Sequence, residues 1–464
     1  MWPLTVAEIA RITAGIIIAG NDNTQVNGIS TDSRTLKEED LFVALPGERT
    51  DGHKFVPMVL SQAAAAALVT RPVDCICPPG KSIILVADTS QALLELGAWY
   101  RRQFLVRTVA ITGSTGKTTT KDLIAKVLMK RWRTLKSPGN LNTEIGLPLT
   151  LFNLGQDHEM AVLELAMRGP GQIRQLAEVA RPEVGVITNI GVAHLGVLGT
   201  RANIARAKGE LLEILPAQGI AVLNGDDLYL RRQSSRCRCS VIYFGLKGDA
   251  DMRGFDISRE GMAGISFTVD GLCGRGRVQL PLIGKFNVSN ALAAIAVGHY
   301  FGLSLAEMTA ALKEVRPPAM RLNIIKRPDG ALIIDDAYNA NPVSMRGALG
   351  AMSDLAQGRR TVAVLGDMLE LGALAPAAHK EVGRLVGEQG VDCLIAVGFW
   401  ASNVVEGAIG AGFDVKKTHI CPDAEAAANV ALSQVRPRDV VLVKASRGLQ
   451  FEHIVAILKQ EGCR

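Results

Sequence analysis

Short apolar runs, each long enough for one buried strand, alternate with helical patterns through the middle of the chain. Strands and helices that alternate in this way fold into a mostly parallel sheet with helices on both faces. The runs in the middle third are "RTVAITG", "HEMAVLELA", "EVGVITNIG" and "GIAVLNGDD". The last third repeats the pattern in "ALIIDDAYNANP", "RTVAVLGDM", "VDCLIAVG" and "DVVLVKAS". The sequence therefore predicts an α/β protein with two such sheets.

The length of 464 residues predicts about three domains. We expect an N-terminal domain over 1–84, a central domain over 85–315 and a C-terminal domain over 316–464. In the first of these, short strand-like runs precede the alanine-rich "VPMVLSQAAAAALVT", for which a helix is expected. The stretch "VRPPAMRL" is expected to be a linker, because two prolines cannot continue the preceding helix.

The composition argues against several classes of protein. No apolar run approaches the roughly 18 residues that cross a bilayer, and nothing frames the N-terminus as a signal peptide. We therefore expect a cytoplasmic protein without membrane insertion. A net charge of +6 is modest, and the basic clusters are better explained as solvated faces than as a nucleic-acid surface.

Eight cysteines include two C-x-C pairs, Cys75/Cys77 and Cys237/Cys239. Paired zinc ligands are usually two to four residues apart, so these pairs are expected to be reduced thiols rather than a metal site.

The stretch "VAITGSTGKTTTKDLI" reads as a strand, a glycine-rich turn and a helix, which is the arrangement of a phosphate-binding loop. The familiar loop would need a glycine at position 111, where Ile111 stands, and only two residues separate Gly113 from Gly116. Backbone N–H groups and the start of the helix offer positive potential to a phosphate chain. In such a loop Lys117 contacts the phosphates and Thr118 coordinates Mg²⁺.

Three polar residues stand where apolar ones are expected or where ligands bind. Ligands in open α/β sheets lie beyond the carboxyl ends of the strands. Glu164, at such an end, is either a Mg²⁺ ligand or an ion-paired carboxylate, and His194 is either a metal ligand or a satisfied loop histidine. Lys208 lies on the same helical face as Ile204, so it must reach solvent, form an ion pair, lose its proton or be modified.

Four further polar groups have both a structural and a functional interpretation. Asn287 and Asn290 open an alanine-rich helix and either cap it or bind a base. Turn chemistry accounts for the asparagine–proline pair that ends "DDAYNANP". The polar turns at Ser33–Arg34 and Ser446–Arg447 suit an anion or a carboxylate.

Taken together, these stretches resemble the Mur ligases, the ATP-dependent amide-bond-forming enzymes that build the peptide of bacterial peptidoglycan. The resemblance covers nearly the whole chain and rests on motifs in the expected order, which are "TGSTGKTTTK", "GNLNTEIGLPLTL", "VLELAMRGPGQI", "TNIGVAHL", "RAKGEL", "GKFNVSNALAA" and "DDAYNANPVSM". "ELAMRGPGQI" and "DDAYNANP" are similar to the branch that joins D-alanyl-D-alanine to UDP-N-acetylmuramoyl-tripeptide. The D-x-A-H-x-P and D-N-P-R motifs of its diaminopimelate- or lysine-adding relatives are absent.

The resemblance implies a fold and a set of site residues. The fold would be a small N-terminal α/β domain, a central P-loop-type sheet that is mostly parallel, and a Rossmann-like C-terminal domain that closes on the substrates. The residues expected to bind ATP are Gly113, Ser114, Thr115, Gly116, Lys117, Thr118, Thr119, Asn287, Asn290, Arg321 and Asp336. Two Mg²⁺ ions would be held by Thr118, Glu164, His194 and Lys208, with Lys208 carbamylated as in many members; Lys117, Glu164, His194 and Lys208 would be catalytic.

The resemblance also implies substrate contacts. Ser33 and Arg34 would meet the uridine diphosphate, and Asn142 and Thr143 the muramoyl part or its peptide. Candidates for the incoming dipeptide are Asn339, Asn341, Ser446 and Arg447. Phe286 stands where many relatives have histidine, so no role of that histidine carries over. A monomer is expected, and no residue set indicates whether the tripeptide ends in diaminopimelate or lysine.

Two alternatives belong to other classes. A folylpolyglutamate synthase-like ligase would lack the uridine-binding first domain that "STDSRT" and "FVALPGERTDGHKF" resemble. A P-loop NTPase switch would hydrolyse ATP and bind a protein partner without a muramoyl substrate.

Overall fold

The computed structural model describes residues 3–47 and 50–460, and the chain divides into two compact units. Glu48 and Arg49, within the "FVALPGERTDGHKF" stretch, lie outside the described residues. Among the described residues no helix is long and apolar enough to cross a membrane. The first unit comprises the residues through Thr112, Arg131–Gly185 and Glu210–Gly219, and the second comprises Gly113–Lys130, Val186–Gly209 and the residues from Ile220 onward.

A five-stranded sheet in the order β2-β7-β6-β5-β4 forms the N-terminal part of the first unit. Its neighbours pair in parallel, apart from β2 with β7. Apolar side chains are buried on both of its faces, against α1 and α3 on one and α2 on the other. The strands are β2 (Ile16–Ala19), β4 (Gly28–Ser30), β5 (Asp40–Val43), β6 (Ala66–Val69) and β7 (Ser82–Leu85), and a small ladder joins β1 (Leu4–Thr5) to β3 (Gln25–Val26). The helices are α1 (Val6–Ile12), α2 (Val56–Gln62) and α3 (Thr89–Arg101).

The alanine-rich stretch from 56 to 70 is a helix only in its first half, so the expected single helix is wrong in its second half. Helix α2 ends at Gln62, and Ala66–Val69 form the fully buried strand β6 in the middle of the sheet. Alanine favours a helix only by a fraction of a kcal/mol per residue, and burial between two strands outweighs that preference.

The rest of the first unit supplies three parallel strands, β8 (Arg107–Thr112), β9 (Thr134–Lys136) and β10 (Met160–Glu164). Strand β10 pairs with both β8 and β9, and Glu164 lies in register with Ile111. The carboxyl ends of β8 and β10 therefore meet at one edge, as predicted from their apolar runs. The helices of this part are α5 (Gly146–Leu151), α6 (Gln172–Ala180) and α9 (Glu210–Ile214).

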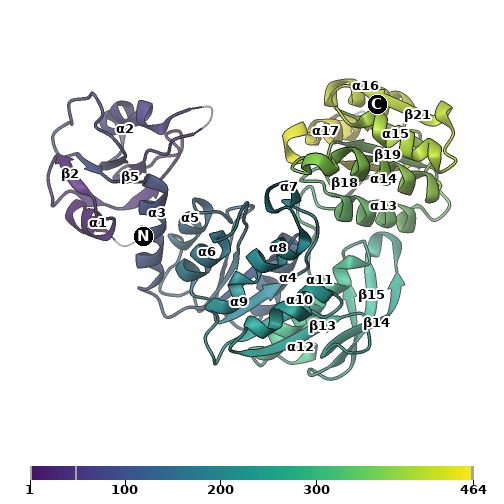
Figure 1. Cartoon of the computed structure of the whole chain (residues 1–464), viewed down its shortest axis with the longest axis horizontal. Helices are drawn as coiled ribbons and strands as arrows, with labels where there is room; N and C mark the ends of the chain where they lie inside the picture. Colours follow the sequence, from purple (N-terminus) through teal and green to yellow (C-terminus); the bar gives the residue numbers. More distant parts are fainter. Residues whose placement is uncertain (1–2, 48–49, 461–464) are drawn as a thin grey trace. The chain divides into compact units, whose positions relative to one another are not determined.

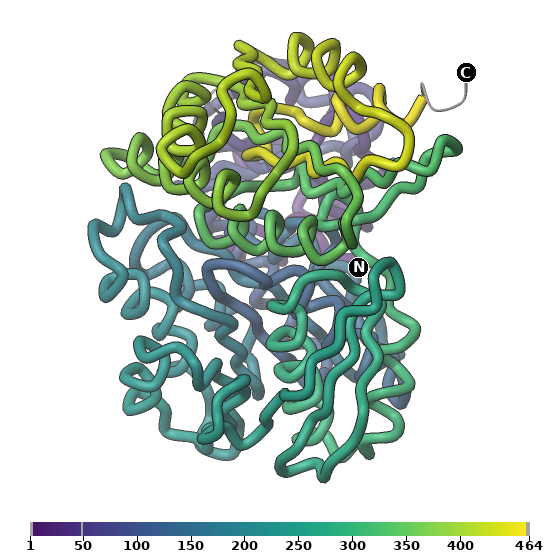
Figure 2. The backbone as a smooth tube through the Cα atoms, turned by 90° about the vertical axis from the view of Figure 1, so that its right-hand side faces the viewer, coloured from purple at the N-terminus to yellow at the C-terminus, as the bar shows by residue number. Residues whose placement is uncertain are grey.

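The second unit begins at the predicted phosphate loop, and its first part contains strands that the alternating pattern did not indicate. Strands β12, β13 and β14 pair in parallel, whereas β14, β15 and β16 form an antiparallel meander that Figure 2 shows in teal. The strands here are β12 (Ile220–Asn224), β13 (Ser240–Gly245), β14 (Met252–Arg259), β15 (Ile265–Gly271) and β16 (Gly276–Leu280), with β11 (Val184–Ile187) preceding them in the chain. The helices are α4 (Lys117–Leu128), α7 (Leu195–Leu198), α8 (Arg201–Lys208), α10 (Leu228–Gln233), α11 (Phe286–Tyr300) and α12 (Leu305–Lys313).

The C-terminal part of the second unit is a six-stranded sheet in the order β17-β18-β22-β19-β20-β21. All neighbours pair in parallel apart from β17 with β18. Helices α13, α14 and α15 cover one face, and α16 and α17 cover the other (Figure 1). The strands are β17 (Asn323–Lys326), β18 (Leu332–Asp335), β19 (Thr361–Gly366), β20 (Cys393–Val397), β21 (Thr418–Cys421) and β22 (Val440–Lys444). The helices are α13 (Pro342–Ala356), α14 (Ala375–Glu388), α15 (Ala401–Gly410), α16 (Ala424–Gln434) and α17 (Glu452–Gln460).

The expected α/β class is therefore confirmed, with helices on both faces of the last sheet. Residues 315–322, which contain the expected linker, form neither helix nor strand.

Candidate active site

The predicted phosphate loop lies between β8 and α4. Gly116 is the N-cap of α4 and adopts a left-handed conformation with φ of 77°. A side chain at this position would also collide with a neighbour, because its Cβ would lie 2.7 Å from the Oδ1 atom of Asn290. Glycine is therefore required at position 116, and the N–H groups at the start of α4 remain in the orientation that suits a phosphate chain.

Residues that directly follow strand β11 hold this loop. The N–H of Ser114 donates to the carbonyl of Asn189 at 3.0 Å, and the N–H of Thr115 donates to its Oδ1 at 3.1 Å. The hydroxyl of Thr188 donates to the carbonyl of Thr115 at 2.6 Å. Sequence reasoning missed Thr188 and Asn189, although two polar residues at the end of an apolar strand were a signal for them.

Lys117 and Thr118 already have protein partners. The Nζ of Lys117 donates to the carbonyl of Gly113 at 2.9 Å. Arg321 donates from Nη2 to the hydroxyl of Thr118 at 2.9 Å, and its guanidinium lies 4.0 Å from the centre of the Tyr338 ring. Arg321, which the resemblance links to ATP, is therefore positioned at the residue to which the resemblance assigns Mg²⁺.

Asn287 and Asn290 support the loop from α11 and do not cap that helix, which has no side-chain cap at all. Asn290 accepts a hydrogen bond from the Thr120 hydroxyl at 3.2 Å and donates to Asn287 at 2.8 Å. Asn287 in turn donates to the carbonyl of Ile283 at 2.8 Å. The capping interpretation is wrong, and the two amides form a hydrogen-bonded chain beneath the loop.

Lys208 is buried, with 1% of its surface exposed. Within the described part of the chain, no hydrogen bond or ion pair joins its amine to another residue. Burial, and then the charge of Lys117, hold the pKa of Lys208 well below its ordinary value. Exposure to solvent through a long side chain, the commoner outcome for such a lysine, is therefore not observed.

The helix expected around Lys208 is two helices, because α8 ends at Lys208 and α9 starts at Glu210. The apolar face predicted from Ile204, Leu211 and Leu215 is buried as expected.

His194 adopts a left-handed conformation with φ of 62° just before α7. Its Nδ1 lies 3.1 Å from the Oε2 of Glu370, a residue of the loop after β19. Burial, followed by the charge of Lys208, lowers the pKa of His194, and Glu370 opposes this effect. His194 is thus near both Lys117 and Lys208, as the metal interpretation requires. Glu370 was not foreseen.

Glu164 is buried at the end of β10 in the first unit. The side-chain amide of Asn142 donates to its Oε1 at 2.8 Å, and the Ser137 hydroxyl accepts a hydrogen bond from the Glu164 N–H at 3.1 Å. The structure therefore brings Asn142 and Glu164 together. Thr143 lies next to them and accepts, through its carbonyl, a hydrogen bond from Leu147 at 2.9 Å.

The polar turn of the N-terminal part is organised by Asp32. The guanidinium of Arg34 donates twice to the Asp32 carboxylate, at 2.9 and 2.6 Å. These hydrogen bonds lower the pKa of Asp32 to about 2. Arg34 is largely exposed and Ser33 partly so, which leaves both reachable by a ligand.

A buried ion pair lies at the carboxyl ends of β18 and β22. The Nζ of Lys444 donates to the Oδ2 of Asp336 at 2.6 Å and to the carbonyl of Asn339 at 2.8 Å. Burial raises the pKa of the neighbouring Asp335. Asn341 caps α13 through a capping box with Ser344, so the asparagine–proline pair has a structural role at the start of this helix. Lys444 was missed, although a lysine that ends the apolar run "VVLVK" is unusual.

Ser446 and Arg447 follow shortly after Lys444 in the chain, and their side chains have different surroundings. The hydroxyl of Ser446 accepts a hydrogen bond from the N–H of Leu369 at 2.9 Å, so it fixes the loop after β19. Arg447 is exposed and forms an ion pair with Glu452 at 2.7 Å.

The donor set around His194 fits a divalent cation only if Lys208 is modified. Among the described residues no three histidine, cysteine, aspartate or glutamate side chains gather into a metal-binding group. The unmodified amine of Lys208, near Lys117, carries no negative charge that would attract a cation. A carbamate on Lys208 would offer the oxygen ligands that Mg²⁺ prefers. The C-x-C pairs also form no such group, and their thiols are free.

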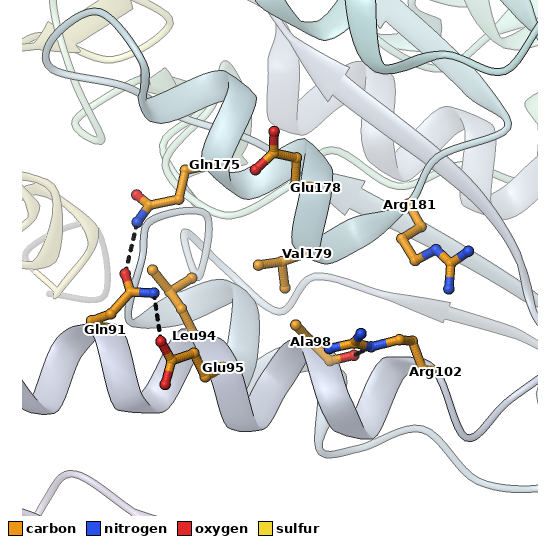
Figure 3. Close-up of a pocket in the computed structure, with 9 residues that line it drawn as sticks. All are labelled: Gln91, Leu94, Glu95, Ala98, Arg102, Gln175, Glu178, Val179 and Arg181. Atoms are coloured by element: carbon orange, nitrogen blue, oxygen red, sulfur yellow. Dashed lines mark hydrogen bonds between the residues drawn. The ribbon is translucent and has the colours of Figure 1, made fainter. Parts of the chain in front are cut away.

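A groove of about 460 Å³ lies between α3 and α6 in the first unit (Figure 3). Its polar lining includes Gln91, which donates to Glu95 at 3.0 Å and accepts from Gln175 at 3.1 Å. No residue predicted for the site lines it. The reactive side chains lie instead at the phosphate loop and at the strand ends.

Comparisons with known proteins agree with this arrangement. Three family models match, described as "Mur ligase family, catalytic domain" (residues 25–101), "Mur ligase middle domain" (111–298) and "Mur ligase, glutamate ligase domain" (320–447). The UDP-N-acetylmuramoyl-tripeptide--D-alanyl-D-alanine ligase of Bacillus subtilis is 37% identical over 97% of each chain.

Solved structures give the same result. The crystal structure of MurF from Acinetobacter baumannii matches with a TM-score of 0.89 at 34% identity over 99% of both chains. MurF ligase from Thermotoga maritima in complex with ADP matches with a TM-score of 0.82 at 30% identity, over 94% of this chain and 98% of that one. The sequence resemblance and the expected fold are therefore confirmed.

Proposed function

This chain belongs to the Mur ligase family, and on that premise we propose that it joins D-alanyl-D-alanine to UDP-N-acetylmuramoyl-tripeptide at the expense of ATP. The observation that carries the proposal is the identity of 37% with a ligase of that name over 97% of both chains. The motifs "ELAMRGPGQI" and "DDAYNANP" support the same branch.

The chemistry follows from the weakness of a carboxylate as an acyl donor. Transfer of the γ-phosphoryl group to the tripeptide carboxylate gives an acyl phosphate; the dipeptide amine attacks its carbonyl, and phosphate leaves. Two anions must approach each other, so positive groups are needed where charge develops. Lys117 and the N–H groups of the loop would supply them, and two Mg²⁺ ions would further neutralise the phosphates when bound.

Arg321 and Asp336 would reach the nucleotide from the C-terminal part. The contact of Arg321 with Thr118 supports this role, because it shows that the guanidinium reaches the loop. Asn287 and Asn290 would lie beside the adenine, and Glu164 would hold Mg²⁺ at the end of its strand. Ser33, Arg34, Asn142 and Thr143 would bind the nucleotide sugar and its peptide, and Asn339, Asn341, Ser446 and Arg447 remain candidates for the dipeptide.

Lys208 would act as a carbamate. An amine that is buried, lacks an anionic partner among the described residues and lies near Lys117 is unfavourable as a cation. Its neutral form is a nucleophile: the nitrogen would bond to the carbon of carbon dioxide, one C=O π bond would become the carboxylate, and the nitrogen would release one proton. The resulting carbamate would then complete a metal-binding set with His194.

The domain limits would follow the roles. Residues 1–84 would bind the UDP-sugar, 85–315 would bind ATP, and 316–464 would close on ATP and the dipeptide. Closure would keep water from the acyl phosphate. Small-angle scattering curves that do not change with ATP and substrate would count against this motion.

The test is phosphate release from ATP and Mg²⁺ with UDP-N-acetylmuramoyl-tripeptide, with and without D-alanyl-D-alanine. We expect release to need both substrates and the product to gain the mass of the dipeptide less water. Release without either substrate would indicate an NTPase, and release that needs a folate and glutamate would indicate the other ligase class.

A further inference from the structure

We propose that Glu370, in the loop after β19, is a positioning residue that fixes the ring of His194 so that its Nε2 atom faces a metal ion. This inference rests on the proposed function, because it assigns His194 to the metal site. None of the sequence motifs pointed to Glu370, and its role follows from the geometry of the contact.

The contact selects one of the two ring nitrogens. Glu370 approaches His194 at Nδ1, with 3.1 Å between Nδ1 and Oε2. A carboxylate only accepts hydrogen bonds, so the neutral ring carries its proton on Nδ1. The lone pair is then on Nε2, which has no hydrogen-bond partner among the described residues. Histidines that bind metals are oriented in this way by a carboxylate on the other nitrogen.

The loop that carries Glu370 is held on both sides. The N–H of Met368 donates to His379 at 2.9 Å, and the N–H of Leu369 donates to Ser446 at 2.9 Å. Both Met368 and Leu371 are buried, so their side chains anchor the loop on either side of Glu370.

The backbone conformations of Glu370 and His194 also support this contact. Glu370 has φ of 63° and His194 has φ of 62°. Such left-handed conformations are uncommon for residues other than glycine, but asparagine, aspartate and histidine adopt them more often than the rest, so the conformation is unusual chiefly for Glu370. Gly196 and Gly372 bring the two segments close, since a Cβ on Gly196 would lie 3.4 Å from the Glu370 carbonyl. The unusual conformation of Glu370, opposite His194, indicates that the contact is maintained by its surroundings.

The arrangement links two parts of the chain. His194 precedes α7, near Lys117 and Lys208, whereas Glu370 comes from the sheet that also carries Asp336 and Lys444. The orientation of the metal-ligating nitrogen thus depends on the position of the loop after β19. Glu370 does not touch the reacting atoms in this account and acts through His194 alone.

The experiment compares Glu370→Leu, which removes the acceptor, with Glu370→Gln, whose amide oxygen can still accept from Nδ1. Glu406→Leu is the matched control, because Glu406 is equally exposed and forms an ion pair with Lys380, far from His194 in the sequence. The whole protein is labelled with ¹⁵N at its seven histidines, and His194→Gln assigns the signal of interest. Two-bond ¹⁵N–¹H spectra then report which ring nitrogen carries the proton.

We expect the Nδ1–H form in the wild type, in Glu370→Gln and in Glu406→Leu, and a shift toward the Nε2–H form in Glu370→Leu. Mn²⁺ titration of the protein with ADP, followed by electron paramagnetic resonance, should show one class of ion bound about 10- to 100-fold more weakly in Glu370→Leu alone. An unchanged tautomer or an unchanged Mn²⁺ affinity in Glu370→Leu would overturn the inference, as would the same loss in Glu406→Leu.

Failure of the proposed function is distinguishable from failure of this inference. The tautomer is read without any substrate, so it does not depend on ligase activity. A wild-type protein that makes no amide product but keeps the Nδ1–H form would refute the activity and leave the orientation of His194 intact.

Discussion

The buried pair of Asp336 and Lys444 gives the sharpest prediction for stability. The two side chains are 13% and 2% exposed, and the ions are 2.6 Å apart. At that separation their attraction is roughly 6 kcal/mol for an effective dielectric constant of about 20. Desolvation costs several kcal/mol per ion, so the intact pair contributes little net stability.

Removal of one partner has a different consequence. Asp336→Asn leaves Lys444 buried without its counter-charge, and we expect the free energy of unfolding of the C-terminal part to fall by about 3–5 kcal/mol. The double variant Asp336→Asn/Lys444→Met removes both charges and should recover most of that loss. The coupling between the two sites is therefore expected to be a large part of the single-variant effect.

Hydrogen exchange followed by mass spectrometry suits this measurement, because it reads each sheet separately in a chain of several domains. Amides of β18 and β22 in Asp336→Asn should lose protection by roughly two to almost four orders of magnitude. The reasoning is wrong if the free energy of unfolding of Asp336→Asn stays within about 1 kcal/mol of the wild-type value. It is also wrong if the double variant is no more stable than Asp336→Asn. Activity should stay low in the double variant, because the proposed contact of Asp336 with ATP is not restored.

Four further predictions concern single positions. Lys208→Met should increase the free energy of unfolding by about 1–2 kcal/mol, seen as a higher melting temperature, and should abolish ligation. Lys208→Ala should also lose activity and regain part of it with short carboxylic acids. Full activity in either variant would contradict the carbamate. Gly116→Ala should raise the KM for ATP, because its backbone conformation would be strained by about 1–2 kcal/mol and its Cβ would lie 2.7 Å from Asn290. Gly302→Ala is the control: Gly302 also has a left-handed φ, of 80°, but no atom lies within 4 Å of the added Cβ, so only stability should change. Gly383→Ala should separate α14 from α15 and lower the melting temperature, since its Cβ would lie 1.8 Å from the Val404 carbonyl oxygen. Gly350→Ala in α13 places its Cβ in open space and should increase the free energy of unfolding by about 0.5–1 kcal/mol. The pKa of Asp32, about 2, should return toward its ordinary value in Arg34→Ala, and an NMR titration of the Asp32 carboxyl would measure the change. Because this pKa is depressed in the folded protein, the stabilisation from the Asp32–Arg34 pair is present above about pH 4 and is lost as the pH falls toward 2.

Local patterns predicted most of the elements that position the site. The apolar runs before Thr112, Glu164, Asp335 and Lys444 each form a buried strand, because three or four consecutive apolar residues fit a strand covered on both faces. The position of Lys208 on the same helical face as the buried Ile204 also followed from their spacing, although its own burial did not. Each of these inferences needs only the residues within one element.

Features that depend on pairing between distant segments were not predictable in the same way. The antiparallel strands β14 to β16 mix charged and apolar residues, so their pattern is weaker than that of a buried parallel strand. Asn189, Glu370 and Lys444 become significant only through partners far along the chain. No spacing in the sequence records that Glu370 contacts His194, since the two residues are 176 positions apart.

The positions that break local rules gather around the proposed site. A buried lysine without an anionic partner among the described residues and the left-handed conformation of Glu370 both oppose folding. The buried cores around the sheets have to offset these costs. Such conflicts are expected where a protein keeps a geometry for its ligands rather than for its own stability. The same logic explains why Lys208→Met is expected to stabilise the chain and abolish its activity: the unfavourable residue is retained for the chemistry it enables.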